Sequence, residues 1–165
     1  MAQDIATSTT PLPNILGSST LPILAVVNQK GGVGKTTTAI NLSAAVAELG
    51  HPVLLIDLDP QANSTSGLGL NPARARLTIY HVLAGECTLS EAAVPSGAPG
   101  LQLVPSHVDL AGAEVELAGM TERETRLRKA LTNAPDGIEL VIIDCPPSLG
   151  LLTLNGQPKY VAPSQ

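Results

Sequence analysis

Residues 28–37 read Asn28-Gln29-Lys30-Gly31-Gly32-Val33-Gly34-Lys35-Thr36-Thr37, and this stretch decides the fold. It follows the apolar run from Ile23 to Val27 and opens a helical pattern that runs to Leu49. A glycine-rich turn between a strand and a helix can direct backbone N–H groups at a phosphate, while a lysine reaches the outer phosphates and a Ser or Thr hydroxyl holds Mg²⁺. The stretch therefore predicts a P-loop that binds a nucleotide.

The loop departs from the general P-loop pattern G-x-x-x-x-G-K-[ST] at its start. That pattern would place glycine at Gln29, whereas this chain has an additional lysine, Lys30, inside the loop. We expect Lys35 to neutralise charge on the phosphates and Thr36 to hold Mg²⁺. The predicted phosphate cradle consists of Gly31, Gly32, Val33, Gly34, Lys35, Thr36 and Thr37.

Acidic residues follow two further apolar runs of the chain. Asp57 and Asp59 come after the run from Val53 to Ile56, and Asp144 ends the run from Leu140 to Ile143. The carboxyl ends of parallel strands face the ligand in doubly wound sheets, so we expect these carboxylates near the P-loop. Asp144 is interpreted as the Walker-B acid beside a Mg²⁺-bound water, and Asp57 as support either for the Mg²⁺ shell or for the loop.

Motifs along residues 23–155 resemble the ParA/Soj family of deviant-Walker-A partition ATPases. They are K-G-G-V-G-K-T-T at 30–37, D-L-D-P-Q-A-N at 57–63, T-S-G-L-G at 65–69 and I-I-D-C-P-P-S-L-G at 142–150. The resemblance implies ATP and Mg²⁺ as cofactors. It also implies a homodimer in the ATP state, a ParB-type partner protein and non-specific DNA binding, which is doubtful for this chain.

The same resemblance implies roles for individual residues. Lys30 matches the signature lysine that crosses the dimer interface to the partner's phosphates, and Thr37 matches a residue that touches the α-phosphate. Asp59 matches the carboxylate that positions the attacking water. The predicted catalytic residues are therefore Lys30, Lys35 and Asp59, and the predicted metal site is Thr36, Asp57 and Asp144.

The fold class follows from the spacing of the apolar runs. Runs at 23–28, 53–57, 101–104 and 138–143 alternate with helical patterns, which predicts an α/β fold of the P-loop NTPase kind, with a parallel sheet covered by helices on both faces. The resemblance stops near Asn155, so we expect a fold that is incomplete at the C-terminus. The expected divisions are a flexible extension at 1–22, the ATPase part at 23–155 and an unrelated, disordered tail at 156–165.

Helical patterns are expected at 78–84, 89–94 and 110–118, and Gly50 suits the left-handed position after the first helix. A capping box of Thr121 with Glu124 predicts a further helix that reaches Asn133.

That last helix carries a basic cluster, Arg123, Arg126, Arg128 and Lys129, which has two interpretations. The cluster could face DNA, because basic patches neutralise phosphate. The favoured interpretation is a solvated face in which Glu122 pairs with Arg126 and Glu124 with Arg128.

Composition limits the remaining possibilities. The chain has 165 residues, 44% of them apolar, with no Phe or Trp and a net charge of -5. An aliphatic core is expected, single-strand binding by aromatic stacking is excluded, and any DNA contact must be local. Cys87, Cys145 and the histidines follow no metal-ligand spacing. No apolar run approaches the roughly 20 residues of a membrane span, so a cytoplasmic protein is expected, with nucleoid association implied by the resemblance.

The leading functional hypothesis is a ParA-type ATPase in chromosome or plasmid partitioning, acting as an ATP-dependent dimer switch with Mg²⁺-dependent hydrolysis. The alternative is a truncated, catalytically dead fragment that at most binds nucleotide or a partner, with poor solubility from an exposed sheet edge. Two other relatives with such a loop fit less well. MinD-like proteins need a C-terminal amphipathic helix, and the iron protein of nitrogenase needs cluster cysteines.

Overall fold

The computed structural model of the chain describes residues 21–28, 30, 32, 34–147 and 150–156. Its centre is a five-stranded sheet with the strand order β1-β5-β2-β4-β3. All neighbouring strands are parallel except β3 and β4, which are antiparallel. The strands are β1 (Ile23–Val26), β2 (Val53–Asp57), β3 (Val94–Pro95), β4 (Leu101–Val104) and β5 (Leu140–Asp144).

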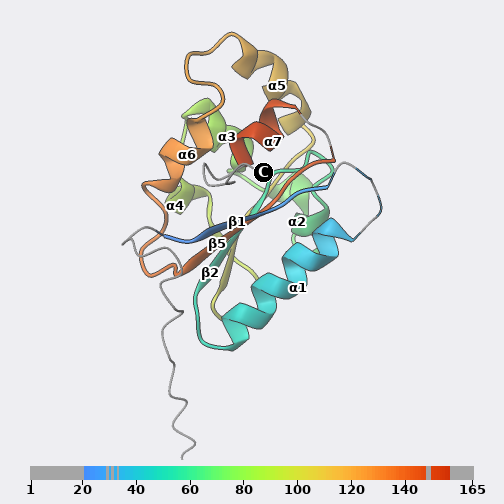
Figure 1. Cartoon of the computed structure of the whole chain (residues 1–165), viewed down its shortest axis with the longest axis vertical. Coiled ribbons are helices and arrows are strands. Elements are labelled where there is room, and N and C mark those ends of the chain that lie inside the picture. Colours follow the sequence, from blue (N-terminus) through green and yellow to red (C-terminus); the bar gives the residue numbers. More distant parts are fainter. Residues whose placement is uncertain (1–20, 29, 31, 33, 148–149, 157–165) are drawn as a thin grey trace, which may run out of the picture.

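Helices cover both faces of this sheet, as the alternation of the sequence predicts. They are α1 (Lys35–Glu48), α2 (Asn63–Gly67), α3 (Ile79–Ala84), α4 (Leu89–Ala92), α5 (Leu110–Ala118), α6 (Arg126–Leu131) and α7 (Leu151–Gly156), with a short 3₁₀ turn at Pro72–Arg74. Helix α1 lies on one side of the sheet, and α3, α6 and α7 lie on the other (Figure 1). The fold is therefore the predicted α/β class.

The alternation of side chains along β2 explains why every residue of this strand is buried. Val53 and Leu55 belong to the core layer that contains Ala39 of α1. Leu54 and Ile56 face the opposite layer, which the other helices supply. Successive side chains of a strand point to opposite faces, so a continuous apolar run is what a strand covered on both sides requires.

The structure corrects two expected elements. The helix expected at 89–94 ends at Ala92, because the chain then turns into the short edge strand β3. The helix expected to start from a capping box of Thr121 with Glu124 begins only at Arg126, with Thr125 as the residue before it. Glu122 has a left-handed backbone with φ 57°, so the chain does not enter a helix there.

The borders of the folded part also differ from expectation. Leu21, expected in the flexible extension, packs against the core, and the Pro22 carbonyl accepts a hydrogen bond from Val141 N–H at 2.9 Å. Gly156, expected in the unrelated tail, is the last residue of α7 and is buried. The rest of the extension (1–20) and of the tail (157–165) lies outside the described residues.

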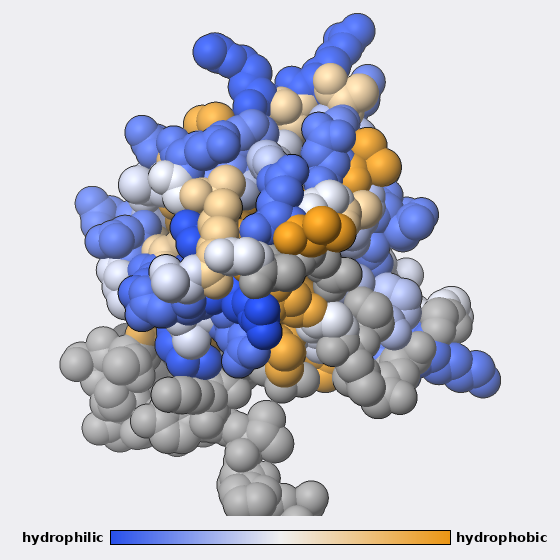
Figure 2. All heavy atoms as spheres, turned by 90° about the horizontal axis from the view of Figure 1, so that it is seen from above, coloured by the Kyte–Doolittle hydropathy of each residue, from blue (hydrophilic) through white to orange (hydrophobic). Residues whose placement is uncertain are grey.

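Large apolar side chains that remain exposed include Leu49, Val108 and Val115. Seen from above, hydrophobic atoms lie in spots among hydrophilic ones (Figure 2). Scattered apolar residues of this kind are normal for a folded domain. Within the described segments, no helix is both long and apolar enough to cross a bilayer.

Candidate functional site

The P-loop ends at the first turn of α1. Gly34, the residue before the helix, has φ 83°, and Gly32 has φ 72°, which are left-handed conformations that favour glycine. Thr38 N–H makes the first helical bond to the Gly34 carbonyl at 2.8 Å, so the preceding N–H groups are free of the helix ladder. Such an end, with its positive dipole, suits an anion. Gly31 and Val33 of the predicted cradle lie outside the described residues.

Two of the predicted acids stand side by side at the carboxyl end of the sheet. Asp57 ends β2 and Asp144 ends β5, and the two residues are direct partners in the register of these parallel strands. Asp59 follows two residues after the end of β2 and is only 7% exposed. The sequence prediction that the acids gather at one edge of the sheet therefore agrees with the structure.

Asp144 has one oxygen that is engaged and one that is not. Ser64 Oγ donates to Asp144 Oδ2 at 2.8 Å, whereas Oδ1 is buried and has no hydrogen-bond partner among the described residues. Burial raises the pKa of Asp144, hydrogen bonds from the Ser64 and Thr36 side chains lower it, the charge of Asp59 adds to the rise, and the charge of Lys35 opposes it. Thr36 and Lys35 of the P-loop are thus close to this carboxylate.

An unpaired buried carboxylate oxygen is costly unless a cation or donor meets it. Asp144 Oδ1, with the Thr36 hydroxyl nearby, supplies the hard oxygen ligands that Mg²⁺ prefers. Across the part of the chain that is described, no group of three or more His, Cys, Asp or Glu residues is arranged to hold a metal. The oxygen donors of Asp144 and Thr36 fit a Mg²⁺ ion that would take its other ligands from phosphate and water.

Asp57 is engaged by the loop that follows it. Its Oδ2 accepts hydrogen bonds from Thr65 N–H at 2.8 Å and from Thr65 Oγ1 at 2.7 Å, and its Oδ1 accepts one from Asp59 N–H at 3.3 Å. Burial raises the pKa of Asp57 to about 7, although the bonds from Thr65 oppose the rise. Of the two roles expected for Asp57, support of the loop is the one seen; its role at the metal stays a prediction.

Asp59 lies in a tight turn that leads into α2. Gln61 N–H donates to Asp59 Oδ1 at 2.9 Å, and Ala62 N–H donates to the Asp59 carbonyl at 2.9 Å. Ala62 itself is buried and has φ 52°, an unfavourable conformation for a residue with a Cβ. Strain of this kind persists only where the surroundings hold it in place.

The second lysine of the loop has a different environment. Lys30 is exposed, and its backbone N–H donates to Asn28 Oδ1 at 3.0 Å. Thr37, also predicted to touch the nucleotide, is exposed as well. The exposure of Lys30 does not test its predicted role across a dimer interface, which stays a prediction.

Sequence reasoning missed the two hydroxyl residues that bind the acids, Ser64 and Thr65. Both are fully buried. Thr65 stood in one of the motifs, but nothing in its spacing indicated which carboxylate it would meet. The available signal was a pair of adjacent hydroxyl residues shortly after the D-L-D-P segment, because small hydroxyl residues satisfy buried carboxylates.

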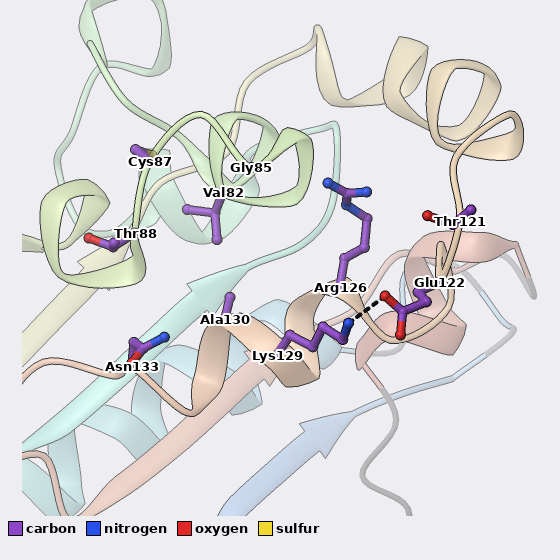
Figure 3. Close-up of a pocket in the computed structure, with 10 residues that line it drawn as sticks. All are labelled: Val82, Gly85, Cys87, Thr88, Thr121, Glu122, Arg126, Lys129, Ala130 and Asn133. Atoms are coloured by element: carbon purple, nitrogen blue, oxygen red, sulfur yellow. Dashed lines mark hydrogen bonds and ion pairs between the residues drawn. The ribbon is translucent and has the colours of Figure 1, made fainter.

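A separate cleft lies between α3 and α6, away from the P-loop, and Figure 3 shows the residues that line it. Arg126 points to the end of α3, where its guanidinium donates to the Leu83 and Ala84 carbonyls. Lys129 pairs with Glu122. The expected pair of Glu122 with Arg126 is therefore wrong, because Arg126 caps α3 instead.

These features define a P-loop nucleotide-binding domain of the α/β class. They are the left-handed glycines before α1, the buried acids at the ends of β2 and β5, and the lysine and threonine close to Asp144. The AAA domain family matches residues 21–158 of the chain. The chain belongs to this family and, within it, to the ParA/Soj group that its motifs resemble.

Similar proteins support this assignment. The chain is 50% identical over 144 residues to the chromosome partitioning protein ParA of Caulobacter vibrioides, covering 85% of this chain and 53% of that protein. It is 54% identical over 132 residues to the chromosome-partitioning ATPase Soj of Thermus thermophilus, covering 80% of this chain and 49% of that protein. The chain thus spans about half the length of these relatives.

A solved structure with the same fold is that of cobyrinic acid a,c-diamide synthase from Mycobacterium smegmatis, with a bound ATP analog and magnesium. It is 47% identical to this chain, with a TM-score of 0.80, and the match covers 83% of this chain and 56% of the other.

Proposed function

We propose that this chain binds ATP with Mg²⁺ and works as an ATPase of the ParA/Soj kind in chromosome or plasmid partitioning. The observation that carries the proposal is the buried Oδ1 of Asp144, which has no hydrogen-bond partner in the described segments and lies beside Thr36 and Lys35 at the end of the sheet that the P-loop borders. The same chemistry is supported by the ATP analog and magnesium bound to the related synthase and by the names of the ParA and Soj relatives.

The residues divide the work as follows. The N-terminus of α1 and Lys35 hold the phosphates and offset their charge, and Thr36 and Asp144 hold Mg²⁺. The ion, when bound, neutralises charge that develops on the phosphates. Asp59 orients the water that attacks. Lys30 reaches the phosphates of a second copy, so that ATP favours the dimer.

Further parts of the proposal rest on the resemblance to the ParA/Soj family alone. A ParB-type protein would stimulate hydrolysis, and the protein would act in the cytoplasm near the nucleoid. Two basic residues of α6 are engaged within the molecule, Arg126 with the carbonyls at the end of α3 and Lys129 with Glu122.

Equilibrium binding of ATP, with Mg²⁺ or with EDTA, tests the proposal. We expect Mg²⁺-dependent binding of ATP by the wild-type chain, and a shift of its sedimentation to a dimer that Lys30→Ala prevents. Binding without hydrolysis or dimerisation would favour the alternative of an inactive fragment. Failure to bind ATP at all would overturn the proposal.

A further inference from the structure

The short helix α2 carries two adjacent hydroxyl residues that bind different acids. Ser64 Oγ donates to Asp144 Oδ2 at 2.8 Å, and Thr65 Oγ1 donates to Asp57 Oδ2 at 2.7 Å. Because Asp57 and Asp144 are partners at the ends of β2 and β5, a single turn of helix is fastened across both strands. We call Ser64 and Thr65 the hydroxyl clamp.

Thr65 extends the clamp to a third strand. Its Oγ1, besides donating to Asp57, accepts a hydrogen bond from Ser106 N–H at 3.0 Å, just beyond β4. A hydroxyl can donate and accept at once, so Thr65 satisfies groups on both sides. The ends of β2, β4 and β5 are therefore joined through one helical turn.

The clamp also faces a strained segment. Between Asp59 and the clamp, Ala62 is held at φ 52°. Its N–H bond to the Asp59 carbonyl and the bond from Gln61 N–H to Asp59 Oδ1 make residues 59–65 one compact unit. If the clamp were released, the strain at Ala62 would favour a different backbone, and Asp59 would move with it.

We propose that Ser64 and Thr65 are positioning residues of the nucleotide site. Ser64 occupies Oδ2 of Asp144 and so leaves Oδ1 as the oxygen that faces a metal ion. Thr65 fixes Asp57 and the segment that carries Asp59. This inference rests on the proposed function, because it takes Asp144 as an acid that meets Mg²⁺.

The decisive variant is Ser64→Ala, with Ser66→Ala, an exposed serine of the same helix, as the matched control. The measurement is the affinity for ATP in Mg²⁺ and in EDTA. Loss of a hydrogen bond that orients a metal ligand reduces metal affinity about tenfold. We therefore expect Ser64→Ala to lose about tenfold of the Mg²⁺-dependent gain in affinity, with binding in EDTA unchanged and Ser66→Ala like the wild type.

A second pair of variants separates positioning from packing. Thr65→Val keeps the shape of the side chain and removes the hydroxyl, whereas Thr65→Ser keeps the hydroxyl. Because Thr65 fastens the same helical turn that carries Ser64, we expect Thr65→Val to lose part of the Mg²⁺-dependent gain and Thr65→Ser to keep it. This pair decides the question if Ser64→Ala does not fold.

The outcomes distinguish the two proposals. A wild-type chain without Mg²⁺-dependent ATP binding contradicts the proposed function itself. Mg²⁺-dependent binding that Ser64→Ala and Thr65→Val leave unchanged overturns the clamp alone. Equal losses in Mg²⁺ and in EDTA would mean that the hydroxyls serve only stability, which also overturns it.

Discussion

Charged side chains gather in two regions of this molecule, and they are balanced in opposite ways. At the ends of β2 and β5, the acids Asp57 and Asp144 are buried side by side. In the cleft between α3 and α6, Lys129 pairs with Glu122 (Figure 3), and Arg126 donates to the backbone carbonyls of Leu83 and Ala84.

This difference in how the charges are partnered indicates which of the two regions binds a ligand. Burial raises the pKa of both acids at the sheet end, and a nearby carboxylate adds to each rise, Asp144 for Asp57 and Asp59 for Asp144. The cleft needs nothing from outside, because its charges already have partners. An unbalanced buried charge marks a functional site more reliably than a hollow in the surface does.

The largest effect is expected on ATP affinity, from removing the lysine of the P-loop. We expect Lys35→Ala to weaken ATP binding in Mg²⁺ by about a thousandfold, or about 4 kcal/mol, because a charged contact to the phosphates is lost. Lys129→Ala in the cleft is the control and should bind like the wild type. Equal affinities for Lys35→Ala and Lys129→Ala would contradict the assignment of the site.

The raised pKa of Asp57, about 7 against an ordinary 3.8, predicts a pH dependence. The folded state holds this proton more tightly than the unfolded state, so the free energy of unfolding should fall as the pH rises from about 4 to about 7. The expected fall is about 2 to 4 kcal/mol from this group. Urea unfolding at a series of pH values in EDTA should show that the free energy of unfolding falls less with pH in Asp57→Asn than in the wild type. An equal fall in both would contradict the raised pKa of Asp57.

In the cleft, the expected effect is on stability and not on binding. Arg126→Ala removes the donors that cap the end of α3 and should lower the free energy of unfolding by about 2 kcal/mol, with ATP affinity unchanged. Urea unfolding measures this, with Arg128→Ala on the same helix for comparison. A loss of ATP binding in Arg126→Ala would contradict the view that the cleft serves stability alone.

The smallest expected effect concerns the strain at Ala62. Glycine tolerates φ 52° without a Cβ penalty, but Ala62→Gly also removes a buried methyl group, so the two effects should nearly cancel and the free energy of unfolding should change by less than about 1 kcal/mol. Ala45→Gly, at an exposed position in the middle of α1, should lower it by about 1 kcal/mol. Thermal unfolding distinguishes the two, and equal destabilisation by both would mean that Ala62 is not strained.

Much of the fold was predictable because its strands are long apolar runs. The runs expected at 53–57 and 101–104 coincide with β2 and β4. β3 and α2 were missed because both are short and neither has a periodic pattern. α2 contains Asn, Ser, Thr and Gly, which are poor helix formers, and tertiary hydrogen bonds hold it.

For the site, the sequence predicted the acids but not how they are held. A strand end locates Asp57 and Asp144, since parallel strands finish at one edge. That Asp57 serves the loop through Thr65 depends on a turn with a left-handed Ala62, which no local pattern indicates. The capping box at Thr121 failed for the same reason, because Glu122 adopts a positive φ.

The register of Asp57 with Asp144 has a consequence for the whole domain. β5 and β2 are interior strands of the sheet, so a cation bound at their ends stabilises the core and not a peripheral loop. A ligand that binds only the native site lowers the population of every open form in which that site is lost. Binding of a cation at the ends of β2 and β5 should therefore slow digestion by a protease at cleavage points far from the P-loop.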